Sequence, residues 1–275
     1  MRRSLVGCLV AWVLSATVAG AAGHPVEPIG GPWGHGADGA TERFLLEARI
    51  VDVRELGTGV THPKKLTLAL GDRTAFGVWK GIDEQSTSPS STRARRDDLL
   101  FSDRWQHEVA AYRLDRLLGL GVVPPTVARV VDREPGSLQA WIDDAFTERQ
   151  RVEDGRALTD AAAYGRASQS MHVFDALIYN VDRTQENILI TEPGSRLWLI
   201  DHSRAFRLTP RLPTLGRRGP LVMPPDVLQA LLALDFEATR SALLGLLTER
   251  QVAGLLGRRE RLLTATSAAV PAGRE

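Results

Sequence analysis

Cysteine is almost absent from this chain of 275 residues: Cys8 is the only one, and it lies in an N-terminal apolar run. A fold without a cysteine pair has no disulfide and must be stabilised by its core alone. Neither sign of charge is in excess, because the chain has 34 Lys and Arg residues and 33 Asp and Glu residues, and its net charge is +1. This balance gives no general attraction to nucleic acid or to an anionic membrane, so we expect no nucleic-acid partner.

Lysine is scarce as well. It occurs only at Lys64, Lys65 and Lys80, while arginine supplies the other basic side chains. A compact ammonium group binds phosphate oxygens differently from a planar guanidinium, so chemistry that needs the ammonium has few candidates here. The hydrophobic share of 43% and the charged share of 24% are ordinary for a globular protein. The length suits one large domain or two coupled lobes, and we expect a monomer.

The N-terminus has the pattern of an export signal. Arg2 and Arg3 precede an apolar stretch over residues 5–18, and small residues follow at 19–21. This order predicts a signal peptide over residues 1–21, and thus a secreted protein in the periplasm, the extracellular space or a secretory lumen. The alternative is an uncleaved membrane anchor over residues 5–23, whose length approaches that of a spanning helix. Both interpretations put the folded part outside the cytoplasm.

The rest of the chain divides by composition and periodicity. Residues 22–44 are predicted to be a flexible linker, because Gly, Pro and His crowd at their start. Residues 45–145 combine strand-like alternation with one strong helix and form a predicted N-lobe. Residues 146–265 are mainly helical with a small hairpin and form a predicted C-lobe, and residues 266–275 are a predicted disordered tail. The expected fold class is α+β, with a small antiparallel β lobe plus one helix and a mainly helical second lobe.

A polar loop between two apolar segments carries the first candidate site residues. Asp182 and Asn187 stand five residues apart after an apolar helix, and a strand-like run follows them. Phosphoryl transfer needs a carboxylate beside the acceptor hydroxyl and an amide oxygen on the metal from such a loop. A second apolar run over residues 197–200 ends in Asp201. Asn187 and Asp201 would together give Mg²⁺ or Mn²⁺ two oxygen ligands.

The N-terminal half supplies a matching pair of charges. Lys80 ends a predicted strand, and Glu108 lies in the first turns of the next helix, which Ser102 or Asp103 would cap. An ammonium group at a strand end contacts phosphate oxygens and needs a carboxylate to hold it. Either residue alone is better explained as a surface charge. The order strand-Lys, helix-Glu, loop Asp and Asn, and strand-Asp is what indicates a nucleotide site.

Three segments resemble a known family. Residues 108–118, with the prolines at 124–125, resemble the helix of the secretory-pathway Golgi casein kinase family. Residues 174–183 resemble its catalytic segment, and residues 199–201 resemble its metal-binding strand. The spacing of Asp182, Arg183 and Asn187 is also similar to phosphatidylinositol kinases and HipA-type kinases.

The resemblance implies a two-lobed protein-kinase-like fold and an atypical kinase activity. It assigns catalytic roles to Asp182, Lys80 and Glu108, and metal binding to Asn187 and Asp201. Asp103 lies where the family has a further acidic metal-site residue. Two departures are that Asn187 replaces a more often acidic residue and that the chain is cysteine-poor, whereas the animal members are cysteine-rich.

Nucleotide contacts are predicted from both ends of the N-lobe. Gly57, Thr58 and Gly59 form a Gly-x-Gly turn whose backbone N–H groups would cover the phosphates, although a hairpin turn explains the turn nearly as well. By the family likeness, Gln139 and Ile142 close the lobe where an adenine would rest.

The sequence therefore predicts a metal-dependent phosphotransferase. It would move a phosphoryl group from ATP, or another nucleoside triphosphate, to a hydroxyl of a protein, sugar or lipid, with Mg²⁺ or Mn²⁺ as cofactor. Two alternatives stay open: a non-catalytic pseudokinase that binds a partner, and a nucleotidyl transferase on the same fold. All five key positions are filled, which favours the enzyme over the binding module.

Overall fold

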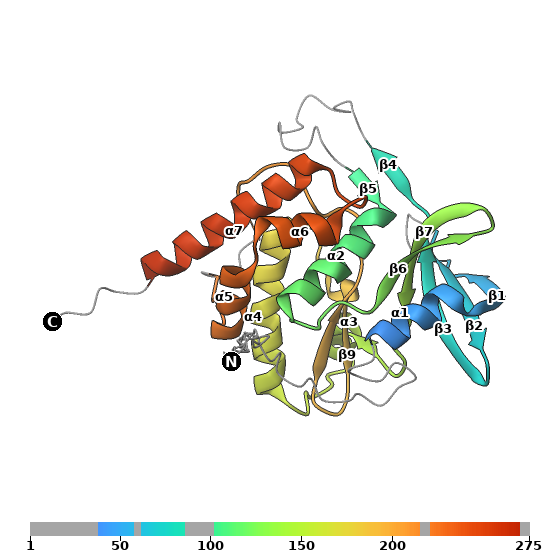
Figure 1. Ribbon diagram of the computed structural model, residues 1–275. Coiled ribbons are helices and arrows are strands. Elements are labelled where there is room, and N and C mark those ends of the chain that lie inside the picture. The colour runs from blue at the N-terminus through green and yellow to red at the C-terminus, as the bar shows by residue number, and fades with distance from the viewer. Residues whose placement is uncertain (1–37, 58–61, 86–101, 215–220, 270–275) are drawn as a thin grey trace, which may run out of the picture.

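The computed structural model describes residues 38–57, 62–85, 102–214 and 221–269 of the chain. Figure 1 shows the larger sheet on one side of the molecule and most of the helices on the other, with α2 between them. This arrangement confirms the predicted α+β fold. The predicted signal peptide, and Thr58 and Gly59 of the predicted phosphate loop, lie outside the described residues. Within the described ranges, no helix combines the length and apolar character that crossing a membrane requires.

An antiparallel sheet with the strand order β1-β2-β3-β7-β6 forms the N-lobe. Its strands are β1 (Arg49–Glu55), β2 (Lys64–Leu70), β3 (Arg73–Lys80), β6 (Thr126–Val131) and β7 (Glu134–Ala140). In β2 and β3, buried positions alternate with partly exposed ones, as the two-residue period of a strand requires. Trp79 therefore faces the core of the lobe, while Lys80 faces the other way and contacts Asp201 of the C-lobe.

A helix that the sequence analysis did not predict precedes the sheet. Helix α1 (Asp38–Glu47) occupies the end of the predicted linker and packs on β6 and β7. Thr41, Phe44, Leu45 and Ala48 are buried, and their spacing of three and four residues is that of one helix face. The linker boundary at residue 44 is therefore corrected, and the N-lobe carries α1 in addition to the one expected helix.

Helix α2 (Trp105–Leu118) is the predicted strong helix, and Gly119 ends it in a left-handed conformation with φ of 66°. The expected cap by Ser102 or Asp103 is wrong, because Ser102–Arg104 forms strand β5, which pairs with β4 (Asp83–Gln85). The N-cap residue, Arg104, makes no side-chain cap. Tertiary partners take over this role, because the backbone N–H groups of Arg104 and Trp105 donate to Ser203 O and Ile82 O.

The C-lobe combines a small sheet of order β10-β9-β8 with helices. Its elements are β8 (Phe146–Thr147), α3 (Glu148–Glu153), α4 (Ala161–Ile178), the 3₁₀ turn η2 (Gln185–Asn187), β9 (Ile188–Thr191), β10 (Arg196–Leu199), α5 (Pro225–Ala233), α6 (Phe236–Leu243) and α7 (Glu249–Ala269). The helix and the two strands predicted around the polar loop are confirmed. The predicted tail is corrected, because residues 266–269 continue α7.

Helix α2 joins the two lobes. Its buried residues, among them Val109 and Leu114, belong to the large apolar core that α4, β10 and the C-terminal helices build. The same helix packs against β6 and β7 of the N-lobe sheet. At its end, Asp115 is fully buried and accepts hydrogen bonds from the N–H groups of Val122 and Val123. The position of Glu108 on α2 is thus set by both lobes.

Candidate active site

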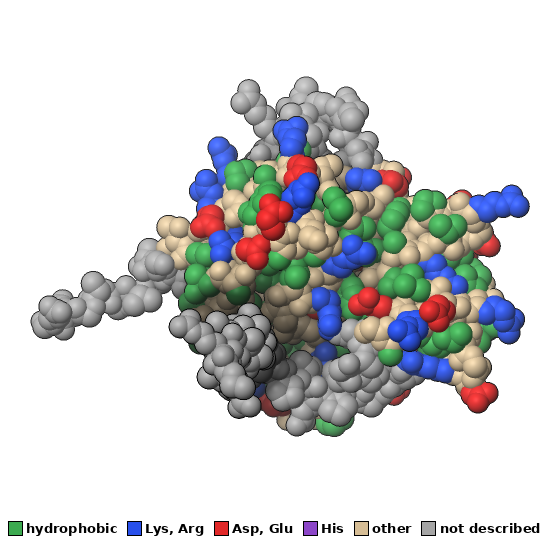
Figure 2. Space-filling model, viewed as in Figure 1, with side chains coloured by type: hydrophobic (Ala, Val, Ile, Leu, Met, Phe, Trp, Pro, Cys, Tyr) green, Lys and Arg blue, Asp and Glu red, His purple; other side chains and the backbone are tan. Residues whose placement is uncertain are grey.

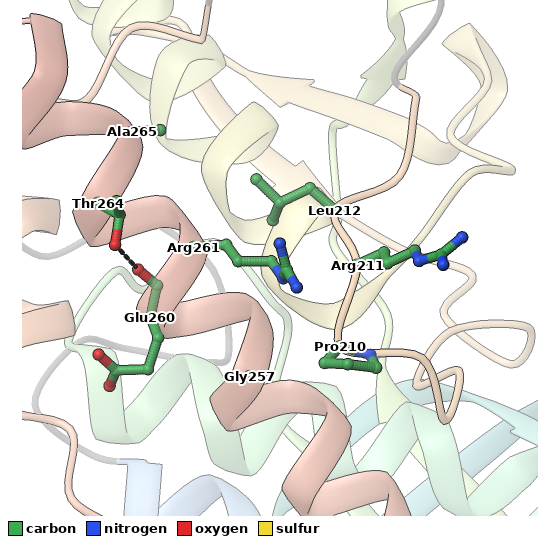
Figure 3. A pocket seen from close by; sticks show the side chains of 8 residues that line it. All are labelled: Pro210, Arg211, Leu212, Gly257, Glu260, Arg261, Thr264 and Ala265. Atoms are coloured by element: carbon green, nitrogen blue, oxygen red, sulfur yellow. Dashed lines mark hydrogen bonds between the residues drawn. The ribbon is translucent and has the colours of Figure 1, made fainter.

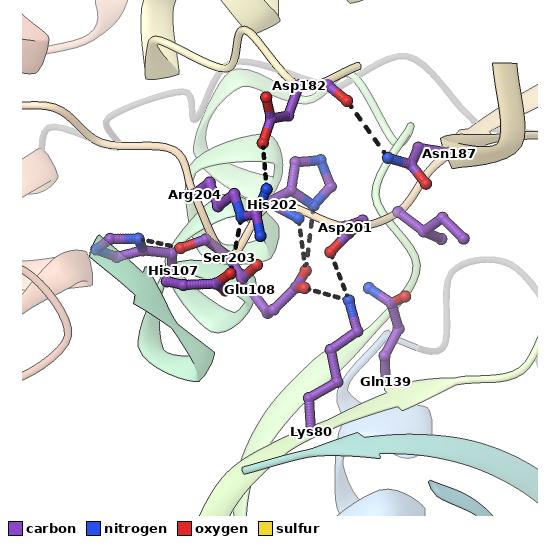
Figure 4. A network of polar contacts seen from close by, with 12 residues as sticks. Lys80, His107, Glu108, Gln139, Asp182, Asn187, Asp201, His202, Ser203 and Arg204 are labelled. Atoms are coloured by element: carbon purple, nitrogen blue, oxygen red, sulfur yellow. Dashed lines mark hydrogen bonds and ion pairs between the residues drawn. The ribbon is translucent and has the colours of Figure 1, made fainter. Parts of the chain in front are cut away.

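Lys80 is the centre of a polar network between the lobes (Figure 4). Its Nζ lies 2.7 Å from Glu108 Oε1 and 2.8 Å from Asp201 Oδ1. The three residues come from β3, α2 and the segment after β10, so the fold brings together charges that are 28 and 121 residues from Lys80. Burial alone would lower the pKa of Lys80, but the two carboxylates outweigh it and raise that pKa above its usual range. The lysine is therefore a permanent cation.

Glu108 connects α2 to the segment that follows Asp201. Its side chain is only 3% exposed, and its Oε2 accepts a hydrogen bond of 3.0 Å from the backbone N–H of His202. Burial would raise the pKa of Glu108, but Lys80 and His202 together hold it well below the usual range. His202 Nδ1 lies 3.4 Å from the same oxygen. Burial lowers the pKa of His202, so its ring is neutral at pH 7 and this approach is not an ion pair.

Asp201 is held in an uncommon backbone conformation. Its φ of 64° lies in the left-handed region, which costs free energy for a residue other than glycine and is often found at functional sites. The side chain is 42% exposed, so it remains accessible to solvent. The backbone N–H of Ile200 donates to Asn187 O at 3.2 Å. This bond sets Asn187, at the end of η2, beside the start of the Asp201 segment.

A buried ion pair fixes the loop that carries Asp182 and Asn187. Arg183 Nη2 lies 2.9 Å from Asp175 Oδ1 of α4, and both side chains are buried. The same guanidinium donates to the backbone oxygens of Asn187 and Ile200. Arg183 therefore ties the polar loop to the segment that carries Asp201. The sequence analysis assigned no role to Arg183 or Asp175. The available signal was Asp175 itself, a charged residue within the apolar run 173–178, because a buried charge needs a partner.

Asp182 is exposed on this loop. Its backbone N–H donates to Asn180 Oδ1 at 3.2 Å, and Asn187 Nδ2 reaches Asp182 O at 3.5 Å. Its side-chain Oδ2 accepts a hydrogen bond of 3.1 Å from Arg204 Nη1. The structure thus brings Asp182 and Asn187 to one side of Asp201, with Lys80 on the other (Figure 4).

The predicted nucleotide contacts are only partly placed. Gly57 follows β1, is exposed and has a φ of 62°, which suits glycine. Gln139 lies on β7, next to β3, and its amide donates to Thr126 Oγ1 at 2.9 Å. Ile142 is partly buried just after β7. Gln139 and Lys80 lie on the same side of the sheet in Figure 4.

The oxygen donors fit a hard divalent cation. Asn187 and Asp201 would hold it, and Mg²⁺ sites commonly use one or two protein oxygens and complete their shell with phosphates and waters. The described residues contain no group of three or more His, Cys, Asp or Glu placed to bind a metal. Asp103 is buried, with Oδ2 bound to Arg204 and Oδ1 without a hydrogen-bond partner. Its predicted metal role stays a prediction.

A second buried network links α2 to α7 through His107. Burial lowers the pKa of His107 to about 4, so its ring is neutral and its Nδ1–H donates to Ser203 O at 2.7 Å. Its Nε2 then accepts from Gln251 Nε2 at 3.1 Å, and that amide also donates to Phe206 O. The segment after Asp201 is therefore held from two sides.

The surface outside this network has its own features. Figure 2 shows basic and acidic side chains interspersed over the face in view, in keeping with the net charge of +1. A groove of about 770 Å³ runs between the segment 210–212 and α7 (Figure 3). None of the predicted site residues lines it. The Lys80 network is therefore the candidate active site on chemical grounds, and the groove is a separate feature.

Comparisons with known proteins find relatives by structure alone. No family profile and no curated protein matches the sequence. A crystal structure of the Golgi casein kinase is 14% identical, with a TM-score of 0.56 over 86% of this chain and 76% of that one. The Golgi casein kinase with Mn/ADP bound is 14% identical, with a TM-score of 0.55 over 83% and 75% of the two chains. Hydra Fam20 with sugar is 15% identical, with a TM-score of 0.52 over 82% and 87%. At these identities the likeness shows a shared fold.

Proposed function

We propose that this chain, which has the kinase-like fold of the Golgi casein kinase, is a metal-dependent phosphotransferase that uses ATP or another nucleoside triphosphate. The observation that carries the proposal is the contact of Lys80 with both Glu108 and Asp201. A fixed ammonium beside a strand-end carboxylate is the arrangement that binds nucleotide phosphates in kinases. The acceptor would be a hydroxyl of a protein, sugar or lipid.

The reaction assigns a task to each side chain. The acceptor oxygen bonds to the γ-phosphorus, the bond from that phosphorus to the bridging oxygen breaks, and a nucleoside diphosphate leaves. Asp182 accepts the proton of the acceptor hydroxyl, and Lys80 contacts the phosphate oxygens. Glu108 keeps Lys80 in place. Asn187 and Asp201 would hold the divalent cation, which neutralises phosphate charge when it is bound.

The two alternatives have weaker support. A pseudokinase binding module does not require all five positions to be filled, yet here they are filled and three of them are in direct contact. No contact among the described residues favours nucleotidyl transfer over phosphoryl transfer. Export by the N-terminal signal, with secretion or anchoring, is part of the proposal, because the basic and apolar pattern of residues 1–21 supports it.

The test is nucleotide binding followed by turnover. ATP at about 100 times its dissociation constant should stabilise the wild-type fold by about 2.7 kcal/mol in the presence of Mg²⁺ or Mn²⁺. Thermal unfolding with each nucleotide and metal measures this, and release of ADP measures turnover. Lys80→Met should lose both effects.

Lys64→Met is the matched control, because Lys64 lies outside the network and pairs weakly with Glu55. It should bind and turn over nucleotide as the wild type does. If no nucleotide changes the melting temperature with either metal, the phosphotransferase proposal is wrong and a non-catalytic binding module replaces it.

A further inference from the structure

Arg204 bridges two carboxylates from different parts of the chain. Its Nε lies 2.7 Å from Asp103 Oδ2, and its Nη1 lies 3.1 Å from Asp182 Oδ2. Asp103 belongs to β5, directly before α2, while Asp182 belongs to the polar loop. Figure 4 shows Arg204 between the Asp182 loop and the Glu108 helix. One side chain thus joins the loop that would receive the acceptor to the start of the helix that holds Lys80.

The two contacts of Arg204, from Nε to Asp103 and from Nη1 to Asp182, have different physical explanations. The Asp103 side chain is 3% exposed, so its buried charge needs a cation beside it, and the contact from Arg204 Nε therefore serves stability. The Asp182 side chain is 46% exposed and would be well solvated without a partner. An exposed ion pair contributes little to stability, so stability does not explain the second contact.

Hydrogen bonds to the neighbouring residue, Ser203, fix the backbone of Arg204. Ser203 O accepts hydrogen bonds from the Arg104 backbone N–H at 2.9 Å and from His107 Nδ1 at 2.7 Å. Both donors come from β5 and α2, so the backbone at Arg204 cannot shift without breaking them. A planar guanidinium on a fixed backbone is a preorganised fork for two carboxylates, which a lysine could not reproduce.

We propose that Arg204 is a positioning residue that orients the Asp182 carboxylate toward the acceptor hydroxyl. The guanidinium occupies Oδ2, and Oδ1 makes no hydrogen bond with another described residue, so Oδ1 is the atom that accepts the proton. Arg204, with its contacts to Asp103 and Asp182, acts as a clamp that joins the loop to the start of α2. Asp182 and the Lys80–Glu108 pair therefore keep a fixed separation. This inference rests on the proposed phosphotransferase function.

The experiment separates the two contacts with a pair of variants. Arg204→Gln removes both contacts and leaves Asp103 as an unpaired buried charge, so the fold should be less stable and turnover slower. Adding Asp103→Asn removes that charge, so stability should recover. Turnover should not recover, because Asp182 is still without its partner.

The measurements are urea unfolding, the dissociation constant for ATP with Mn²⁺, and ADP release with water as acceptor. Because Asp103 is itself a candidate metal-site residue, Asp103→Asn alone is the reference for the double variant. Relative to that reference we expect kcat to fall roughly 10- to 100-fold, as for a misplaced reacting group, with ATP affinity the same within about twofold. Arg261→Gln on α7 is the matched control, because Arg261 is exposed and lines the groove remote from the network. It should leave every value unchanged.

Three outcomes would overturn the inference. If the double variant regains both stability and turnover, Arg204 only neutralises Asp103. If Arg204→Gln turns over faster than the wild type, Arg204 blocks Asp182 instead of orienting it. If the double variant binds ATP more weakly than Asp103→Asn alone, in parallel with its slower turnover, Arg204 acts on the nucleotide side.

Hydrogen exchange tests whether Arg204 ties the Asp182 loop to β5, and it does so without a measurement of turnover. Backbone amides of residues 180–187 should exchange faster in the double variant than in the wild type, since the loop has lost its tie to β5. Unchanged exchange there would refute the clamp. A wild-type protein that neither binds nor hydrolyses nucleotide would refute the proposed function, and the exchange result would still stand by itself.

Discussion

At the scale of single residues, Lys80 is the side chain at which the two lobes meet. It comes from the N-lobe sheet and contacts Glu108 on the shared helix and Asp201 in the C-lobe segment. Glu108 is buried and Asp201 is partly exposed, so the two contacts differ in kind. The contact with Glu108 neutralises a buried charge whose loss of partner would destabilise the fold, while the contact with Asp201 joins groups that would both face a nucleotide.

Removal of the Lys80 charge should therefore cost stability as well as binding. Lys80→Met leaves the Glu108 carboxylate buried without a cation, and we expect the free energy of unfolding to fall by about 3 kcal/mol. Urea unfolding of the variant measures the loss. Glu108→Gln added to it should restore part of the stability and none of the ATP binding. An undiminished stability in Lys80→Met would show that the His202 N–H alone satisfies Glu108.

The two aspartates should respond differently to loss of charge. Asp201→Asn removes the carboxylate of the proposed Asn187–Asp201 metal pair, so metal-dependent ATP binding should nearly vanish. Asp182→Asn acts on the acceptor side, so ATP binding should persist while turnover drops by roughly 10²-fold or more. Titration calorimetry with ATP and Mn²⁺, together with ADP release, measures both. The reverse pattern would exchange the roles of the two residues.

At the scale of elements, α2 is the part on which the site depends. It places Glu108 beside Lys80, and the preceding residue, His107, donates a hydrogen bond to the carbonyl of Ser203. The helix has no side-chain cap, because the backbone of Ser203 and Ile82 receives its first N–H groups. The start of α2 and the segment after Asp201 are thus one hydrogen-bonded unit, and a change in either moves the other.

This unit should weaken in acid. Burial lowers the pKa of His107 from 6.5 to about 4, so the unfolded chain binds the proton first. The contribution of the neutral ring is complete above pH 6.5 and is lost as the pH falls toward 4. With about 1.36 kcal/mol per pKa unit, the loss is roughly 3 kcal/mol.

His107→Gln provides the comparison for this acid effect. Its amide still donates to Ser203 O and does not titrate. Urea unfolding at pH 7.5 and at pH 5 should therefore show a smaller loss in the variant than in the wild type. Equal losses in both proteins would place the acid sensitivity in other groups.

At the scale of the whole molecule, helix α2 contributes to the packing of both lobes. Buried residues of α2 belong to the large core of the C-lobe, and the same helix packs on β6 and β7. The N-lobe has a smaller core of its own, built by residues such as Leu66, Leu68 and Trp79. With no cysteine in the described part of the chain, these cores and their shared helix supply the stability.

Loss of packing in α2 should therefore loosen both lobes. Leu114 is fully buried, and Leu114→Ala should cost about 2–5 kcal/mol through the cavity it leaves. Hydrogen exchange should accelerate in β3 and in β10 to a similar degree. Leu244→Ala is the control, because Leu244 is 67% exposed and should change neither. Faster exchange confined to β10 would mean that the lobes unfold independently.

Local patterns in the sequence determined much of the architecture. The alternation in β2 and β3, the helical periodicity of α2 and the Gly119 stop depend on neighbours a few residues apart, and the structure confirms them. The order of Lys80, Glu108, Asp182, Asn187 and Asp201 indicated a kinase-like fold, which the structural comparisons confirm. The roles of these residues stay predictions. Helix α1 was also visible in principle, through the spacing of its buried residues.

Tertiary structure alone decided what holds the site together. Arg204 meets Asp103 across 101 residues and Asp182 across 22, and Glu108 accepts from His202 across 94. No periodicity marks such partners, because their contacts depend on how the lobes pack and not on local backbone preference. The cap of α2 was mispredicted for the same reason. Its first N–H groups are satisfied by carbonyls far away in the sequence, those of Ile82 in the N-lobe and Ser203 in the C-lobe.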